Sequence, residues 1–323
     1  MTRALEDIVG SLGNRQVVVV GDVMLDEYLW GDAYRVSPEA PVPVVQLRGR
    51  SNSLGGAANA ALNAAALGAP VRLAGVVGED QQGAVLRSLL HERCIDDALV
   101  GVDARPTTTK TRILAGHHQV ARVDQEIVTS IADHTADQLI TAVEGALAET
   151  GGVLISDYAK GALPAPVAER VVSLARTAGV PVVADPKGAN FARYRGATLI
   201  TPNLMEAATA LGYEAHASLD VERLGRELVS ELEGTGVLIT RGSEGMSLFR
   251  ADEPAWHVRS AALKVSDVTG AGDTVAATLT LALVAGADLE EAAELANRAA
   301  GLVVQKVGTA TVSPEELHAD LRR

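Results

Sequence analysis

The second half of the chain alternates between short apolar runs and stretches of helical length, and this alternation limits the fold more than any other feature. Four apolar runs typical of buried strands occupy residues 153–155, 180–184, 198–200 and 236–239. Strands that alternate with helices form a mainly parallel sheet covered by helices on both faces. Four consecutive valines, residues 17–20, predict a further buried parallel strand near the N-terminus. We therefore predict an α/β fold.

Each of the four apolar runs is followed directly by polar or charged residues. These residues are Asp157 and Lys160, then Asp185 and Lys187, then Asn203 and Glu206, and finally Thr240, Arg241 and Gly242. In open α/β sheets, ligands bind beyond the carboxyl ends of the strands. One polar strand end would mean little, but four in succession predict the rim of a single binding site. Asp22 follows the valine strand in the same way, either as a ligand for hydroxyl groups or as a solvated loop acid.

Two segments outside the alternation predict a second, smaller sheet. Residues 28–47 contain three closely spaced prolines, which exclude a helix. Residues 106–124 are β-prone, partly alternate in polarity and turn at Gly116, as expected of a hairpin. We expect both segments to be extended and to pair beside the main sheet. Because no repeat, low-complexity tract or linker divides the chain, we expect one domain over residues 1–323.

Residues 267–274 form a small-residue turn that enters an apolar run, as at the start of a buried helix. Backbone N–H groups at such an entry have no helical partner, and the helix dipole favours an anion there. Gly270 and Gly272 allow the backbone to come close to that anion. Asp273 has two interpretations that these residues leave open. It is either an ordinary helix cap or a base beside an anion site, which is the pairing that phosphoryl transfer to a hydroxyl requires.

The composition narrows the class of protein. A net charge of −13 argues against a nucleic acid or an anionic membrane as partner, and it requires a local cluster of bases for any anionic substrate. The single cysteine, Cys94, excludes an internal disulfide and a cysteine-based zinc site. Because the N-terminus has no signal-peptide pattern, we expect a soluble cytoplasmic protein. The chain has no Walker A sequence and no Gly-x-Gly-x-x-Gly after the first strand, which argues against a P-loop NTPase or a simple dinucleotide-binding dehydrogenase.

A glycine pair, Gly55 and Gly56, precedes an alanine-rich stretch that predicts a helix. The pair allows close approach of a ligand, to which Asn59 could present its amide, although a tight loop before a core helix explains it as well. Together with residues 267–274, this pair resembles the two signatures of the ribokinase-like carbohydrate kinases. Within that family, several motifs look like those of the D-glycero-β-D-manno-heptose 7-phosphate kinases. These motifs are residues 35–43, 156–161, 185–188, 201–206 and 306–311.

The resemblance covers the whole chain and implies a ribokinase-like fold, a mainly parallel Rossmann-like sheet with a small β lid. Such lids often pair to make a homodimer in this family. The implied activity is ATP-dependent phosphorylation of heptose 7-phosphate at its anomeric O1. Many bacterial relatives carry a C-terminal nucleotidyltransferase, which we do not expect in a chain that stops at Arg323. The alternatives are a kinase for another sugar, such as a fructose phosphate, and a non-catalytic sugar-sensing protein on the same fold.

The resemblance also implies roles for residues around ATP. Asp273 would be the base, and the N–H groups from Gly270 through Ala271 and Gly272 would hold the γ-phosphoryl oxygens. Asn203 and Glu206, with Leu204 and Met205 between them, would order Mg²⁺ through water. Thr240, Arg241, Gly242 and Asn297 would contact the nucleotide, and Asp267 and Thr269 could hold a potassium ion. Without the resemblance, Asn203 and Glu206 would indicate only a helix N-terminus with an incidental acid.

A further set of residues would bind the sugar phosphate. Asp22, Gly55, Gly56, Asn59, Asp157 and Asp185 are the candidates near the sugar. The candidates for its phosphate are Lys110, Arg112 and Arg122 in the lid, and Lys160 and Lys187 at strand ends. The two strand-end lysines rank first because each follows an aspartate at the carboxyl end of a strand. Any single surface lysine is also explained as a solvated side chain.

Overall fold

The computed structural model describes residues 5–116, 118–213 and 219–322, and its largest element is a nine-stranded sheet. In spatial order the strands are β13 (Trp256–Val258), β12 (Met246–Phe249), β11 (Gly236–Thr240), β10 (Leu199–Ile200), β9 (Val182–Asp185), β8 (Thr150–Ser156), β1 (Gln16–Gly21), β4 (Val71–Gly78) and β5 (Asp96–Val102). The strands from β11 to β5 are parallel, and β12 and β13 extend one edge in antiparallel fashion. This confirms the predicted α/β fold.

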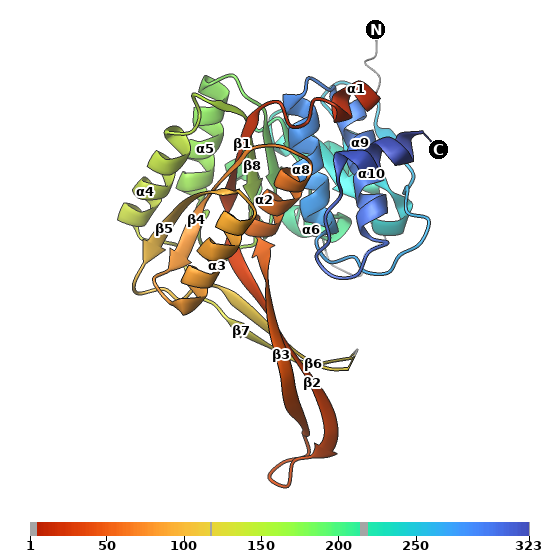
Figure 1. Cartoon of the computed structure of the whole chain (residues 1–323). Helices are drawn as coiled ribbons and strands as arrows, with labels where there is room; N and C mark the ends of the chain where they lie inside the picture. Colours follow the sequence, from red (N-terminus) through yellow and green to blue (C-terminus); the bar gives the residue numbers. More distant parts are fainter. Residues whose placement is uncertain (1–4, 117, 214–218, 323) are drawn as a thin grey trace.

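Helices cover both faces of the sheet (Figure 1). They are α1 (Leu5–Val9), α2 (Ala57–Ala66), α3 (Gln81–Glu92), α4 (Asp133–Glu144), α5 (Ala165–Thr177), α6 (Leu204–Ala210), α7 (Val221–Glu231), α8 (Ala271–Val284), α9 (Leu289–Val303) and α10 (Pro314–Leu321), with short 3-10 turns η1 (Ala192–Tyr194) and η2 (Gly242–Glu244). Residues of α2, α3, α8, α9 and α10 join one buried apolar cluster, and residues of α4 to α7 join the other. The sheet therefore has a separate core on each side.

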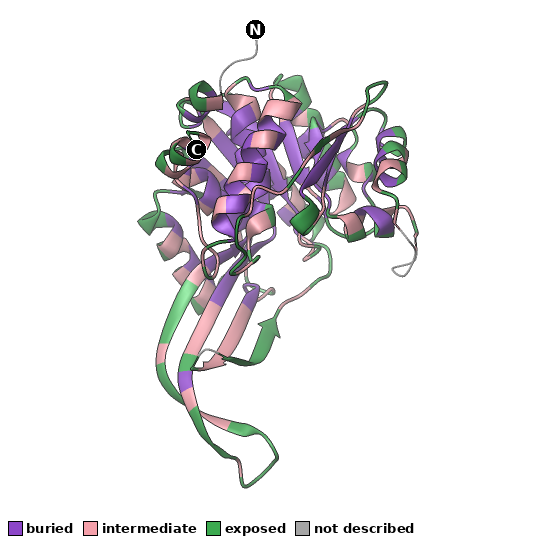
Figure 2. Ribbon diagram, turned by 90° about the vertical axis from the view of Figure 1, so that its right-hand side faces the viewer, coloured by how far each residue is buried: buried purple, intermediate pink, exposed green. Residues whose placement is uncertain are grey.

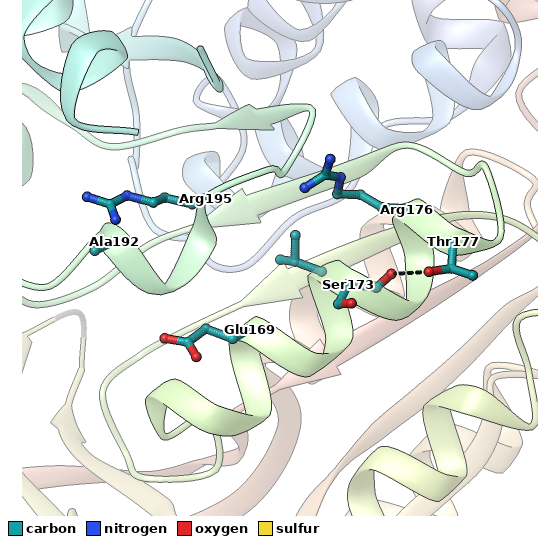
Figure 3. Close-up of a pocket in the computed structure, with 7 residues that line it drawn as sticks. Glu169, Ser173, Arg176, Thr177, Ala192 and Arg195 are labelled. Carbon is teal, nitrogen blue, oxygen red and sulfur yellow. Dashed lines mark hydrogen bonds between the residues drawn. The ribbon is translucent and has the colours of Figure 1, made fainter. Parts of the chain in front are cut away.

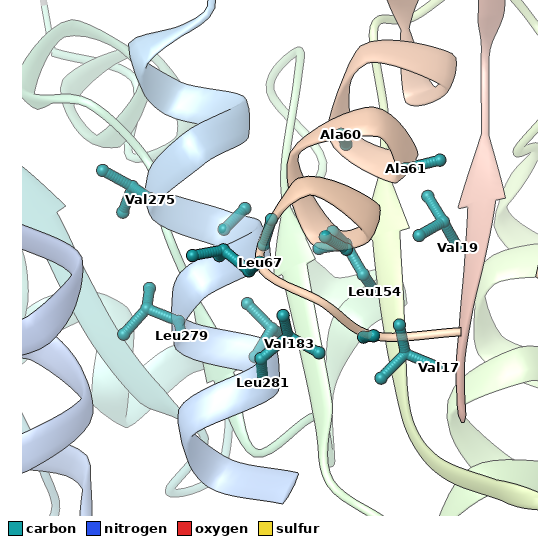
Figure 4. Packing of buried hydrophobic residues seen from close by; sticks show 14 of the residues in the cluster. Val17, Val19, Ala60, Ala61, Leu67, Leu154, Val183, Val275, Leu279 and Leu281 are labelled. Carbon is teal, nitrogen blue, oxygen red and sulfur yellow. The ribbon is translucent and has the colours of Figure 1, made fainter. Parts of the chain in front are cut away.

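The valine run of β1 shows why the sheet needs both helical layers. Successive side chains of a strand point to opposite faces. Val17 and Val19 belong to the cluster with α2 and α8, and Val18 and Val20 to the cluster on the other face. Figure 4 shows Val19 beside Ala61 of α2, with Val17 further along the same strand. Small alanines of α2 fill this layer.

The predicted second sheet is a four-stranded lid with the order β3-β2-β6-β7. Its strands are β2 (Val23–Val36), β3 (Pro43–Gly56), β6 (Thr109–Ala115) and β7 (His118–Gln125). The β2–β3 hairpin extends away from the body of the molecule (Figure 1) and is largely exposed toward its tip (Figure 2). The lid leaves the main sheet directly after β1 and returns at α2, so its base lies beside the carboxyl edge of the sheet.

The lid strands are longer than the sequence suggested. The hairpin begins at Val23 and pairs until Gly56, so Leu54 to Gly56 are strand residues rather than the helix entry. The switch to helix happens at Gly56, whose φ of 56° lies in the region that favours glycine. A Cβ at Gly56 would also lie 2.4 Å from the carbonyl oxygen of Asp22, so the position accepts only glycine.

Strand β5 and helix α10 were not predicted. Strand β5 is an edge strand that starts with two aspartates and is mostly half-exposed, so it lacks the apolar run of a buried strand. Helix α10 does carry a signal, because Ser313 and Glu316 form the capping box that begins it and Pro314 occupies its first turn. In the part of the chain that the structure describes, no helix is long and apolar enough to cross a membrane.

Candidate active site

The N-terminus of α8 presents backbone N–H groups at the carboxyl edge of the sheet. Gly270 precedes the helix with φ 78°, a left-handed conformation that glycine adopts without strain. The N–H of Ala271 donates to the carbonyl of Val268 at 3.2 Å, whereas those of Gly272 and Asp273 find no acceptor among the described residues. A Cβ at Gly272 would meet nothing within 4 Å, so the space before these groups is open. This geometry suits an anion.

Asp273 is buried in the first turn of α8, and two donors hold its carboxylate. The amide nitrogen of Asn59 donates to Oδ2 at 2.6 Å, and the hydroxyl of Tyr158 donates to Oδ1 at 2.7 Å. Burial raises the pKa of Asp273 to about 6, while the two hydrogen bonds lower it and the nearby Asp26 carboxylate raises it. A carboxylate with this pKa is largely ionised at neutral pH and can accept a proton.

Asn59 lies in the first turn of α2 and connects that helix to α8. Its buried Oδ1 has no hydrogen-bond partner in the described part of the chain, so this oxygen can accept a hydrogen bond from a ligand. The hydroxyl of Thr274 donates to Oδ1 of Asn63 at 2.7 Å and fixes the two helices one turn further on. A Cβ at Gly270 would lie 2.9 Å from the Asn59 amide nitrogen, which is a second reason for glycine there.

Asp22 holds the loop that carries Tyr158. Its carboxylate accepts the backbone N–H groups of Tyr158 at 2.9 Å, Lys160 at 3.0 Å and Ala162 at 3.0 Å. Asp22 is buried. Its oxygens are thus engaged in shaping the loop after β8, next to the site where the sequence suggested that they bind a sugar hydroxyl.

A cavity of about 180 Å³ lies beside Gly272, at the carboxyl ends of the central strands. It is lined by Asp157, Tyr158, Asp185, Pro186, Lys187, Thr201, Asn203, Glu206, Thr240, Gly272 and Val275. Residues from all four predicted polar strand ends thus line this one cavity, with Thr240 as the contribution of the fourth strand end. Burial raises the pKa of Asp185 to about 8, helped by the negative charges of Asp273 and Glu206. Asp185 is therefore mostly protonated at neutral pH, and the other two acids of the cavity, Glu206 and Asp157, form ion pairs with Lys187 and Arg193.

Asn203 and Glu206 form a capping box at the start of α6. Oδ1 of Asn203 accepts the N–H of Glu206 at 2.9 Å, and the Glu206 carboxylate accepts the N–H of Asn203 at 2.9 Å. Lys187 forms an ion pair with the other oxygen of Glu206. Among the described residues no three His, Cys, Asp or Glu side chains are grouped as metal ligands. The oxygens present match a site where Mg²⁺ keeps waters and phosphate ligands.

A second cavity of about 200 Å³ adjoins the first, because Thr240 and Gly272 line both. Its lining is mostly apolar and consists of Thr240, Gly242, Ser243, Gly245, Met246, Ser260, Ala262, Val265, Val268, Ala271, Gly272, Asn297, Ala300, Gly301 and Val304. The amide of Asn297 donates to the carbonyl of Arg259 at 2.8 Å. Arg241 instead pairs with Glu244 at 3.1 Å. An apolar cavity that opens toward an anion site suits a planar base with a phosphate chain.

The predicted basic residues of the lid are paired with acids. Lys110 contacts Glu126 at 2.9 Å and Asp124 at 3.0 Å, and Lys160 reaches the same Glu126 at 2.7 Å. Arg122 pairs with Asp124 at 2.8 Å and is half exposed. The two lysines lower the pKa of Glu126, Lys160 most strongly. Lys110 and Lys160 therefore converge from the lid and the main sheet, whereas Lys187 lies in the acidic cavity.

Two other predicted residues serve their own loops. Asp157 is buried and pairs with Arg193 at 2.7 Å and with the hydroxyl of Tyr194. Asp267 accepts the N–H of Thr269 at 2.9 Å, its hydroxyl at 2.7 Å, and the N–H of Gly308 at 3.0 Å. These hydrogen bonds, led by the one from the Thr269 N–H, lower the pKa of Asp267.

Sequence reasoning missed Tyr158, Glu126 and the buried pair of Asp26 with Arg112, whose atoms are 2.6 Å apart. Tyr158 follows a strand-end aspartate directly and lies in the motif of residues 156–161, but neither signal gave it a role. Asp26 and Arg112 are 86 residues apart in the chain, and only the parallel pairing of β2 with β6 brings them together.

A larger surface groove of about 520 Å³ lies away from these residues, between α5 and η1 (Figure 3). It is lined by Glu169, Val172, Ser173, Arg176, Thr177, Ala192 and Arg195. None of the predicted site residues belongs to this lining, and volume alone does not make it the site.

Comparison with known proteins shows that the chain belongs to the sugar kinases. The profile of the pfkB family carbohydrate kinases matches residues 14–316, so the chain belongs to that family and is an ATP-dependent carbohydrate kinase. It is 45% identical over 304 residues to the bifunctional protein HldE of Actinobacillus pleuropneumoniae, covering 94% of this chain and 63% of that protein. HldE of Rhodospirillum rubrum is 43% identical over 319 residues, covering 98% and 64%. The chain thus spans less than two thirds of the length of these curated relatives.

Solved structures give the same fold. Ribokinase of Arabidopsis thaliana, complexed with ribose and ATP, aligns with a TM-score of 0.73 at 23% identity, covering 96% of this chain and 99% of that one. Phosphofructokinase-2 of Escherichia coli in complex with potassium aligns with a TM-score of 0.77 at 20% identity and the same coverage. The ribokinase-like fold that the resemblance implied is confirmed.

Proposed function

We propose that this chain transfers the γ-phosphoryl group of ATP to the anomeric O1 of D-glycero-β-D-manno-heptose 7-phosphate. The products would be ADP and the 1,7-bisphosphate, a cytoplasmic step toward nucleotide-activated heptose. The observation that carries the phosphoryl transfer is the buried Asp273 carboxylate beside the free N–H groups of α8. The choice of heptose rests on the motifs at residues 35–43 and 185–188 and on the similarity to HldE.

In the proposed mechanism, Asp273 accepts the proton of the O1 hydroxyl while that oxygen attacks the γ-phosphorus. The bond from the γ-phosphorus to the bridging oxygen breaks, and ADP leaves. The N–H groups of Gly272 and Asp273 donate to the γ-phosphoryl oxygens as their charge shifts, and Gly270 shapes the turn that aims them. A positioned base typically contributes ~10²–10⁴-fold and an anion-hole donor a similar order.

ATP would lie across the two adjoining cavities. We place the adenine in the apolar cavity near Asn297 and Gly242, and the phosphates past Thr240 and Gly272. Asn203 and Glu206 would hold Mg²⁺ through water, because both residues line the cavity in which we place the phosphates. When bound, the ion neutralises phosphate charge. Potassium is proposed beside Asp267 and Thr269, and comparing rates in potassium and tetramethylammonium salts tests that part.

The phosphate of the sugar would be held by Lys110 and Lys160. Both contact Glu126, and a sugar phosphate would replace this carboxylate between them. We expect Lys160→Ala to raise KM for the phosphorylated sugar much more than KM for ATP. Lys187→Ala is the matched comparison. Lys187 contacts Glu206 in the cavity beside Gly272, so its loss should raise KM for ATP instead. An equal effect of Lys160→Ala on KM for both substrates would argue against this binding site for the sugar phosphate.

A substrate panel with coupled detection of ADP tests the proposed reaction. It should include heptose 7-phosphate, fructose 6-phosphate and unphosphorylated sugars, each with and without Mg²⁺. We expect the highest kcat/KM with heptose 7-phosphate. Preference for a fructose phosphate would favour the alternative sugar kinase, and no ADP release with any sugar would favour a sugar-sensing role.

We further propose that the lid pairs with a second copy of the chain. Its exposed apolar side chains are Trp30, Tyr34, Val36, Val42, Leu47, Val120 and Val123. An apolar surface of this kind is typical of an interface. Light scattering of Val36→Asp should show a monomer, while Val128→Asp, an exposed valine outside the lid strands, should stay dimeric. A monomeric wild type would contradict the proposal.

A further inference from the structure

Tyr158 touches the carboxylate that the proposed mechanism uses as its base. Its hydroxyl donates to Oδ1 of Asp273 at 2.7 Å. The Asn59 amide occupies Oδ2 at 2.6 Å. With one donor on each oxygen, rotation of the carboxylate would break at least one of these hydrogen bonds. The plane of the carboxylate is thus set by groups from two other elements, α2 and the loop after β8.

The loop that carries Tyr158 is itself anchored. Asp22 accepts the N–H groups of Tyr158, Lys160 and Ala162, and Arg105 donates to the carbonyl of Lys160. Such a network limits the positions that the Tyr158 ring can take. The hydroxyl is therefore fixed in place before a substrate arrives, as a preorganised site requires.

The charged groups around this hydrogen bond come from three elements. Asp26 on β2 raises the pKa of Asp273, and Arg112 of β6 pairs with Asp26. Asp185 at the end of β9 and Asp273 are close enough that Asp273 raises the pKa of Asp185. Burial raises the pKa of Tyr158 well above its usual value, and the nearby carboxyl groups of Asp273, Asp185 and Asp26 add to this effect. Tyr158 therefore keeps its proton and acts as a donor throughout the working pH range.

We propose that Tyr158 is a positioning residue for Asp273, which rests on the proposed role of Asp273 as the base. The Tyr158 hydroxyl and the Asn59 amide hold the carboxylate so that a remaining lone pair in its plane receives the proton of the sugar hydroxyl. The hydrogen bond from Tyr158 also stabilises the ionised form of Asp273, which keeps the base available near neutral pH.

The test is the pH dependence of kcat and kcat/KM for Tyr158→Phe, measured with MgATP and the best sugar from the substrate panel. Losing the donor should move the acid limb to higher pH by about one unit, because a hydrogen bond to a charged group has about that effect. At a pH well below the limb, this means a roughly tenfold lower rate. On the high-pH plateau, the loss should be much smaller.

Tyr194→Phe is the matched control. Tyr194 is also a buried tyrosine whose hydroxyl donates to a buried aspartate, Asp157, so its loss has a similar structural cost. Its acid limb should stay at the wild-type pH. If Tyr158→Phe does not fold, Tyr158→Met, which also lacks a donor and does not titrate, carries the same measurement and should move the acid limb in the same direction.

The outcomes separate this inference from the proposed function. Full turnover of Asp273→Asn would show that Asp273 is not the base, and this result would contradict the proposed function. If Asp273→Asn is inactive but the profile of Tyr158→Phe has the wild-type shape, scaled or not, then Tyr158 is only structural and the inference is wrong. A shifted limb in Tyr158→Phe together with an unshifted limb in Tyr194→Phe supports it.

Discussion

Replacing Asp273 by asparagine should inactivate the enzyme. It should also increase the stability of the fold relative to wild type, and this gain should be larger at neutral pH than at acidic pH. Asparagine has nearly the shape of aspartate but cannot accept a proton as a base. We expect turnover to fall by ~10²–10⁴-fold. The stability effect follows from the pKa of Asp273, which burial raises from an ordinary value of 3.8 to about 6. Both effects are measured on one variant.

The sign follows from which state holds the proton. Between about pH 3.8 and 6 the folded chain keeps the proton of Asp273, whereas the unfolded chain has released it. Stability therefore falls as pH rises through this range, and the loss is complete above about pH 6. At about 1.4 kcal/mol per pKa unit, the wild-type carboxylate costs ~3 kcal/mol at neutral pH. Asparagine does not titrate and escapes this cost.

Urea unfolding of both proteins at about pH 4.5 and about pH 8 measures the effect. From the two pKa values we expect the free energy of unfolding of the variant, relative to wild type, to rise by about 2 kcal/mol between these conditions. The hydrogen bonds that asparagine makes poorly with Asn59 and Tyr158 are lost at both pH values and cancel in the comparison. A difference that does not change with pH would refute the burial argument, and near-normal turnover would refute the role as base.

Two further substitutions test the supports of the site. Gly270→Ala would force φ 78° on alanine and bring its Cβ to 2.9 Å from the Asn59 amide, so we expect kcat to fall about 10²-fold through misplaced N–H groups. Wild-type steady-state kinetics would contradict this. Asp22→Ala would leave three loop N–H groups without their acceptor, and we expect about 3 kcal/mol or more of lost stability in urea unfolding. An unchanged unfolding midpoint would contradict it.

The sequence could predict the layers of this fold because its patterns are local. The valine run of β1 has apolar side chains on both faces, which only a strand between two helical layers can bury. The prolines at residues 38–43 lie at the far end of the lid hairpin, where they interrupt no pairing. The edge strand β5 was not predicted, because half-exposed strands carry no such apolar signal.

The partners of the site residues could not be predicted, because they are set by contacts between distant segments. Asn59 and Asp273 are 214 residues apart in the chain, and Tyr158 and Asp273 are 115 apart. Nothing in the local sequence tells that Asp22 accepts loop N–H groups or that Lys110 and Lys160 share one glutamate. The sequence placed these residues near one rim, and the packing of α2 on α8 decides which of them touch.

The charges around the site explain how so acidic a chain can bind two anions. Asp26 is neutralised by Arg112 and Glu206 by Lys187, whereas Asp185 and Asp273 form no ion pair within the described residues. Burial is the main cause of their raised pKa values, about 8 for Asp185 and about 6 for Asp273, so at pH 7 Asp185 is mostly protonated and Asp273 carries a negative charge. A bare triphosphate would be repelled here, so we expect ATP to enter with its magnesium ion and the sugar phosphate to be held apart, between Lys110 and Lys160. Because the two anions bind at separate places, the sugar hydroxyl can reach Asp273 while the phosphate of the sugar stays away from it.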